Sequence, residues 1–293
     1  IDLGGIPLGM GIDCSGVGCH GASEHVTLHA TVLGTNLAEQ AAGSWSVDVH
    51  AAIPLDWHVI SVDAIEPGRL LMASTEGFFQ SIYGGPTSQD INPALYSQVP
   101  PLEWDSRVTI GALDQSGDPF DANMMSDIGI DWTAFEQGGS LTCSMGSWFC
   151  HHSESQTQPI DFIADDCTIR QGVRIARLTC LDRESTLHVG ARLELRDDDQ
   201  DTHLESAAIT AIWNEQVDCN QNRIPDHCDI ALGHSEDADA NGIPDECDGA
   251  CEWDLNHDGI TSVDDLLILI GEFDQTYYVD DLLALLAEFN CGT

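Results

Sequence analysis

The chain has 293 residues and a formal net charge of −41, with 50 acidic residues against nine arginines and no lysine. A field of that sign repels nucleic acid and anionic membranes and attracts divalent cations, so we expect no nucleic-acid partner. Hydrophobic residues make up 42% of the chain, which is enough to bury a core. No run approaches the roughly 20 apolar residues of a membrane span, so we expect no membrane insertion.

Residues 1–24 are rich in Gly, with Ile, Leu and Met between the glycines. The segment has no helical pattern and is too apolar for an ordinary flexible tail. We interpret it as an arm that lies along the edge of a neighbouring subunit, or that folds back over its own domain. Because the chain begins at Ile1 rather than Met, we expect a secreted protein whose signal peptide has been removed.

From His25 onward, apolar and polar residues alternate. The segments 25–32, 44–53 and 187–195 each place their apolar residues at every second position. This period of two, with a solvated opposite face, predicts antiparallel strands. Three further segments have a strand-like composition, 107–113, 172–180 and 207–213. About ten short strands over 25–216, without a long amphipathic helix, predict a mainly β domain, an antiparallel β-sandwich or jelly roll.

Two sequence segments of this domain are similar to a known domain. WDSRVTIGALD at 104–114 and GIDWTAFEQGG at 129–139 resemble an uncharacterised domain of secreted bacterial proteins. The resemblance implies an extracellular β-sandwich and assigns no activity to it.

Beyond the strands, one acidic pattern recurs three times, as DCNQNRIPDHCD, DADANGIPDECD and DLNHDGITSVDD. Each copy has oxygen-bearing side chains at positions 1, 3, 5, 9 and 12, and an isoleucine at position 7 whose backbone carbonyl can face an ion. Ca²⁺ takes about six to eight oxygen ligands from loops of this spacing. A solvated acidic linker is the alternative, but it would not keep three registers with the apolar position. We therefore predict about three calcium ions, bound by Asp218, Asn220, Asn222, Ile224, Asp226 and Asp229; by Asp237, Asp239, Asn241, Ile243, Asp245 and Asp248; and by Asp254, Asn256, Asp258, Ile260, Ser262 and Asp265.

The loops also resemble known calcium modules. The first two, with the pattern NxIPDxC over 217–250, resemble thrombospondin type 3 repeats. The third loop and the VDDLLILIGEF that follows resemble a type I dockerin over 251–293, which implies a cohesin-like partner. The segment VDDLLILIGEF at 263–273 is repeated with few changes as VDDLLALLAEF at 279–289. This repeat predicts two amphipathic helices that pack antiparallel. The chain departs from dockerins before the second helix, where DQTYY is too short for a calcium loop, so we interpret the module as degenerate.

Eleven cysteines predict an oxidising, extracellular compartment. Most stand as close pairs along the sequence, and the last two bracket the C-terminal module. The predicted disulfides are Cys14–Cys19, Cys143–Cys150, Cys167–Cys180, Cys219–Cys228 and Cys251–Cys291, which leaves Cys247 free. The resemblance to bridged calcium repeats keeps Cys228–Cys247 open as a competing pair.

The sequence carries no GxSxG, HExxH or phosphate-binding glycine loop, so we do not expect an enzyme. Of the tryptophans, Trp45 and Trp213 lie on apolar faces and are predicted to be core. Four others stand near turns and are candidates for exposed sugar-stacking residues, Trp57, Trp104, Trp132 and Trp148.

Two functions are compatible with these patterns. The first is a secreted calcium-binding structural protein that assembles with itself, without covalent links, into an extracellular fibre or surface layer. The alternative is a carbohydrate-binding or carbohydrate-active module, with a polysaccharide partner, displayed through a dockerin-like tail. The missing catalytic pattern and the degenerate dockerin favour the first.

Overall fold

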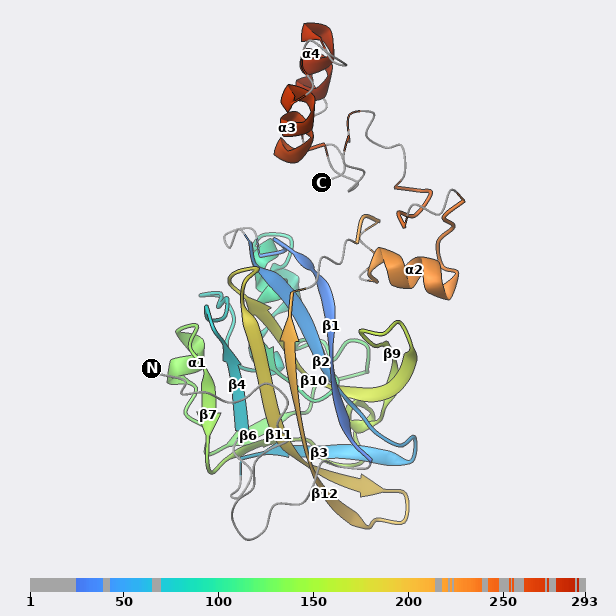
Figure 1. Ribbon diagram of the computed structural model, residues 1–293. Helices are drawn as coiled ribbons and strands as arrows, with labels where there is room; N and C mark the ends of the chain where they lie inside the picture. Colours follow the sequence, from blue (N-terminus) through green and yellow to red (C-terminus); the bar gives the residue numbers. More distant parts are fainter. Residues whose placement is uncertain are drawn as a thin grey trace, which may run out of the picture. The chain divides into compact units, whose positions relative to one another are not determined.

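The computed structural model falls into two compact units, Ile1–Asn214 and Glu215–Thr293 (Figure 1). The residues that it describes are 25–38, 43–64, 70–213, 218–220, 222, 224–238, 242–247, 253, 255, 261–271, 273, 278–287 and 289. The predicted arm, residues 1–24, lies outside them.

The first unit consists of two antiparallel sheets. The five-stranded sheet has the order β1–β2–β10–β5, with β9 also paired to β10; its strands are β1 (Thr27–Thr35), β2 (Trp45–Ala52), β5 (Arg107–Val108), β9 (Ile160–Ile163) and β10 (Ile169–Cys180). The seven-stranded sheet has the order β6–β8–β3–β11–β4–β7, with β12 paired to β11; its strands are β3 (Trp57–Asp63), β4 (Leu70–Ser74), β6 (Ser126–Ile128), β7 (Leu141–Cys143), β8 (Ser147–Phe149), β11 (Thr186–Asp197) and β12 (Thr202–Ile212). The predicted mainly β, antiparallel sandwich is confirmed.

Short helices connect the strands, and longer ones occur in the second unit. The first unit contains the 3₁₀ helices η1 (Ser88–Asp90), η2 (Pro93–Leu95), η3 (Pro100–Trp104) and η4 (Ser155–Thr157), and the α-helix α1 (Thr133–Glu136). The second unit contains α2 (Asp226–Leu232), α3 (Val263–Gly271) and α4 (Val279–Ala287). Helices α3 and α4 form at the two copies of the duplicated sequence, as the apolar periodicity predicts.

One hydrophobic core joins the sheets. Val49 and Leu178 of the five-stranded sheet belong to the same buried cluster as Val62 and Leu193 of the seven-stranded sheet. Two sheets whose inner faces pack against each other in this way form a sandwich. Along β11, buried and less buried residues alternate from Thr186 to Arg196, and every predicted inward residue is buried: Leu187, Val189, Ala191, Leu193 and Leu195.

The outer face of the five-stranded sheet differs from the expectation. We predicted a solvated face for β2, but its first seven residues are all buried. Other parts of the chain cover this face, because Phe162 of β9 stacks on His50 with ring centroids 4.3 Å apart, and the carbonyl of Trp104 in η3 accepts a hydrogen bond from Thr179. Ser46, Asp48 and Thr179 of this face therefore form their hydrogen bonds with other parts of the protein, whereas Nδ1 of His50 is buried without a hydrogen-bond partner.

A buried ion cluster lies on the same face of the sheet. Arg177 donates two hydrogen bonds to the carboxylate of Asp48, at 2.8 and 2.9 Å, and Arg174 donates a third at 2.7 Å. Arg177 also lies over the ring of Trp104, 5.3 Å from its centroid. Burial alone would raise the pKa of Asp48, but the two guanidinium groups outweigh it and hold the pKa well below its ordinary value.

This cluster gives a stability prediction. Replacing Asp48 with Asn leaves two guanidinium groups close together without their shared carboxylate, so Asp48→Asn should lower the free energy of unfolding by about 3–5 kcal/mol. The measurement is urea unfolding followed by tryptophan fluorescence. Asp166→Asn is the matched control, because it breaks an ion pair of the same length, 2.7 Å, that is exposed on the surface. Equal effects of the two substitutions would contradict the prediction.

Candidate metal centre

The first acidic loop, 218–229, surrounds a fully buried carboxylate. Asp229 lies on α2, and its Oδ2 accepts hydrogen bonds from the side-chain amides of Asn220 at 3.2 Å and Asn222 at 2.7 Å. Its Oδ1 is also buried and has no hydrogen-bond partner, although Nδ1 of His234 lies 3.5 Å away. A buried carboxylate oxygen without a donor is costly, and a cation supplies what it lacks.

The other side chains of the loop fold back toward its backbone. The backbone amide of Asn222 donates to Oδ1 of Asp218 at 3.1 Å and to Oδ1 of Asn220 at 3.0 Å. The amide of Ile224 donates to Oδ1 of Asn222 at 2.7 Å. Positions 1, 3 and 5 therefore direct their oxygens into one tight turn, which fits the spacing that predicted a calcium loop.

Electrostatic repulsion accumulates at this loop. Burial, followed by the nearby carboxylates of Asp218, Asp229 and Glu246, raises the pKa of Asp226 to about 6. Arg223 is the single Lys or Arg in the sequence after Asn214, so this part of the chain has little positive charge of its own. A divalent cation would favour the ionised form of each of these acids.

The second loop repeats part of the same geometry. In the first loop, the amide of Cys219 at position 2 donates to Asp226 at position 9, at 2.9 Å. In the second, the amide of Ala238 donates to Asp245 at the equivalent positions, at 2.8 Å. Gly242 at position 6 has a φ of 88°, the left-handed conformation that favours glycine there. The two loops therefore share the hydrogen bond from position 2 to position 9, whereas only the first continues into a helix at position 9.

Glu246 is a residue of the site that the sequence patterns did not single out. It stands at position 10 of the second loop, but its Oε1 accepts hydrogen bonds from Asn220 of the first loop, at 3.0 Å, and from Ser235, at 2.5 Å. These bonds lower the pKa of Glu246. The signal in the sequence was weak, because the equivalent residue of the first loop is His227.

The third loop is described near its end. Asp265 at position 12 is fully buried, and its two oxygens accept hydrogen bonds from the backbone amides of Leu255, at 2.8 Å, and Ser262, at 2.7 Å. The carboxylate thus connects the start of the loop to the first turn of α3. Seven predicted ligands lie outside the described residues: Asp239, Asn241, Asp248, Asp254, Asn256, Asp258 and Ile260.

The disulfide predictions are wrong wherever the structure tests them. Cys219 pairs with Cys247, with their Cα atoms 6.1 Å apart, which excludes both Cys219–Cys228 and Cys228–Cys247 and means that Cys247 is not free. Cys143, Cys150 and Cys180 are free thiols, whereas Cys167 and Cys228 are disulfide-bonded. Cys14, Cys19, Cys251 and Cys291 lie outside the described residues.

The positions of the strands explain why the two disulfides predicted within the sandwich, Cys143–Cys150 and Cys167–Cys180, are wrong. Cys143 ends β7 and Cys150 follows β8, and these strands are separated in the sheet by β3, β11 and β4. Cys167 precedes β10 and Cys180 ends it. At about 3.3 Å per residue, an extended strand of this length keeps its two ends roughly 30 Å or more apart, whereas bridged Cα atoms lie roughly 4.4–6.8 Å apart.

The tryptophans do not form the exposed row that a sugar-binding surface would present. Trp45 is fully buried and Trp213 packs against the core, as predicted. Trp57 and Trp148, which we predicted to be exposed candidates, are buried in the same core, and Nε1 of Trp148 donates to the carbonyl of Thr109 at 2.9 Å. Trp132 is half-buried.

A scan against models of protein families and a search of curated proteins found no match for this chain. No helix in the described part of the chain combines the length and apolar composition needed to cross a membrane.

The orphaned oxygen of Asp229 predicts opposite effects of one substitution in two buffers. In chelator, Asp229→Asn removes a buried charge from an acidic cluster, so the variant should be at least as stable as the wild type. In millimolar calcium it removes a ligand, so the variant should be the less stable protein. Asp264→Asn, at an exposed carboxylate of the same unit, should have little effect in either buffer. Thermal unfolding provides the measurement, and a variant that is destabilised equally in both buffers would contradict a metal role.

Proposed function

We propose that this chain is an extracellular calcium-binding structural protein, with about three calcium ions bound in its C-terminal unit, and that it is not an enzyme. The observation that carries the proposal is Oδ1 of Asp229, a buried carboxylate oxygen without a donor in a loop of calcium spacing. The disulfides indicate an oxidising compartment. Secretion accounts both for the disulfides and for the source of the proposed calcium ions.

The second part of the proposal is self-assembly without covalent links into a fibre or surface layer. Apolar residues at the same positions of the two repeated helices support it, since Val263, Leu267 and Ile270 of α3 correspond to Val279, Leu283 and Leu286 of α4. All six side chains are exposed, with 48–59% of each surface accessible. Such a surface gains free energy when another surface covers it. A second copy of the chain is the occupant that we propose, and a cohesin-like partner is the alternative.

The calcium proposal predicts selective unfolding. Extracellular loops of this kind bind with dissociation constants on the order of 10⁻⁴–10⁻³ M, and free calcium at about 100 times that constant stabilises a site by about 2.7 kcal/mol. Chelation should therefore raise hydrogen exchange across residues 217–293 while the strands over 25–213 stay protected. Sodium chloride at equal ionic strength controls for simple screening of the carboxylates. Unchanged exchange over 217–293 in chelator would overturn the calcium proposal.

The assembly proposal is tested by sizing the full chain in calcium with light scattering. The wild type should form large particles, and a variant without residues 1–12 should not, because the arm is the proposed strand-adding segment. Leu267→Gln combined with Leu283→Gln tests the helices separately and should also reduce particle size. A monomeric wild type in calcium, or equal assembly by all three proteins, would contradict self-assembly and leave the calcium proposal standing.

A further inference from the structure

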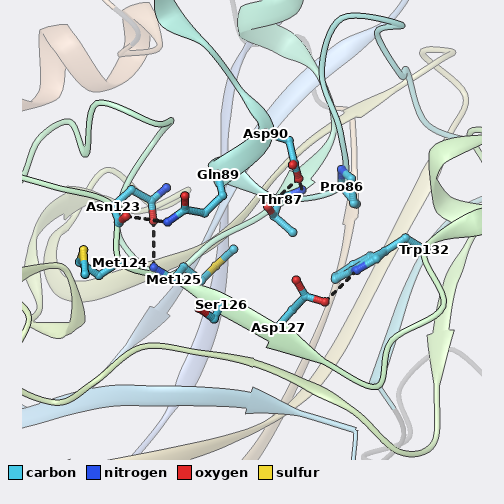
Figure 2. Close-up of a pocket in the computed structure, with 10 residues that line it drawn as sticks. All are labelled: Pro86, Thr87, Gln89, Asp90, Asn123, Met124, Met125, Ser126, Asp127 and Trp132. Carbon is cyan, nitrogen blue, oxygen red and sulfur yellow. Dashed lines mark hydrogen bonds between the residues drawn. The ribbon is translucent and has the colours of Figure 1, made fainter.

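The sandwich unit contains an open cleft that none of the preceding arguments uses. Its volume is about 780 Å³, and it lies between the segment 86–90, which includes η1, and the segment 123–132, which includes β6. Figure 2 shows Asn123 and Met124 at one end and Trp132 at the other, with Asp90 and Asp127 on opposite sides between them. Clefts of roughly 300–1,000 Å³ are the usual size of small-ligand sites.

Many side-chain donors of this cleft are already committed to the protein. Nε2 of Gln89 donates to Asn123, to its backbone carbonyl at 2.6 Å and its Oδ1 at 3.4 Å. The Asn123 amide donates to Ser88 at 2.8 Å and to the carbonyl of Asp114 at 3.0 Å. The hydroxyl of Thr87 donates to Oδ2 of Asp90 at 2.7 Å.

The indole of Trp132 is committed in the same way, because its Nε1 donates to Oδ1 of Asp127 at 3.1 Å. This bond leaves Oδ2 of Asp127 and Oδ1 of Asp90 as acceptors, and neither carboxylate forms an ion pair with another described residue. The cleft thus presents fixed acceptors on two opposite sides. A ligand that matches it must donate hydrogen bonds from two separate points.

The ends of the cleft add an apolar component. Trp132 packs against Phe135 and Trp148, each with ring centroids 6.4 Å away, and it still lines the cleft. At the opposite end, the side chain of Met124 is 54% exposed. A rigid indole and a thioether chain suit the C–H face of a ring rather than a fully solvated ion.

We propose that this cleft binds a neutral oligosaccharide. Sugar hydroxyl groups are donors spread around a ring, so they can reach Asp90 and Asp127 together while the C–H face covers Trp132. The carboxylates disfavour an anionic ligand. A metal ion requires converging ligands, and in the described part of the chain no group of three His, Cys, Asp or Glu side chains converges at this cleft.

The test is isothermal titration of the full chain, in calcium, with cellohexaose, xylohexaose and mannohexaose. At least one should bind with a millimolar or lower dissociation constant. Trp132→Ala should weaken that binding about tenfold or more, since it removes the stacking surface. Asp127→Asn should weaken it about tenfold, because a charge-assisted hydrogen bond becomes a neutral one while the amide oxygen still accepts from Trp132.

Two controls separate a lost site from a lost fold. Tyr278→Ala removes an exposed aromatic residue of the other unit, and Asp199→Asn removes an exposed carboxylate of the β11–β12 turn, so both should bind as the wild type does. Asp127→Asn, whose side chain is exposed, should keep the wild-type unfolding midpoint.

The proposal is overturned if none of the three sugars binds, or if Asp127→Asn binds as tightly as the wild type. It is also overturned if a hexa-arginine peptide binds in their place and loses affinity in the same variants, since the cleft would then be a site for cationic peptides. None of these outcomes bears on calcium, because the cleft belongs to the sandwich unit.

Discussion

The constraint on which this structure depends is the shortage of positive charge. With nine arginines for fifty acidic residues, a buried carboxylate must share a guanidinium or find another partner. Two buried carboxylates of the sandwich take the first course, since Asp48 is held by both Arg174 and Arg177, and Asp63 lies 3.3 Å from Arg192. Asp105 is the exception, because burial raises its pKa to about 7. The C-terminal unit has almost no arginine to offer. Its buried carboxylates at Asp229 and Asp265 accept hydrogen bonds from amides, and amides donate hydrogen bonds without neutralising charge.

This difference separates the physical origins of stability in the two units. The sandwich buries large apolar side chains from both sheets, so its stability comes mainly from the hydrophobic effect. The helices of the second unit leave many of their leucine and isoleucine side chains exposed. Small domains with little buried apolar surface commonly depend on cross-links and bound ions. The proposed calcium ions would therefore have a structural task in the second unit.

The sequence predicted what depends on local periodicity and missed what depends on which segments meet. The alternation along β11 and the two repeated helices were predictable, because each follows from the geometry of a single element. The buried outer face of β2 was not, since nothing in its own residues shows that Phe162 and Trp104 cover it. Disulfide pairing failed for the same reason, as closeness along the chain is no guide to closeness across strands. The cleft joins residues more than thirty positions apart, and Glu246 serves a loop other than its own.

The Cys219–Cys247 bridge acts mainly on the unfolded chain, whereas the proposed ions act on the folded one. The bridge closes a segment of 28 residues that spans the first loop and most of the second. In the chain-entropy account, a loop of that size lowers the entropy of the unfolded chain by an amount equivalent to about 3–4 kcal/mol. An ion instead stabilises the folded loop, and its effect grows with calcium concentration. The bridge holds Glu246 and the second loop beside Asn220 whether or not calcium is bound. Part of the entropy that the two loops lose on becoming ordered is therefore already lost before an ion binds. The repulsion among Asp218, Asp226, Asp229 and Glu246 is the remaining cost, and it is the one that a divalent cation removes.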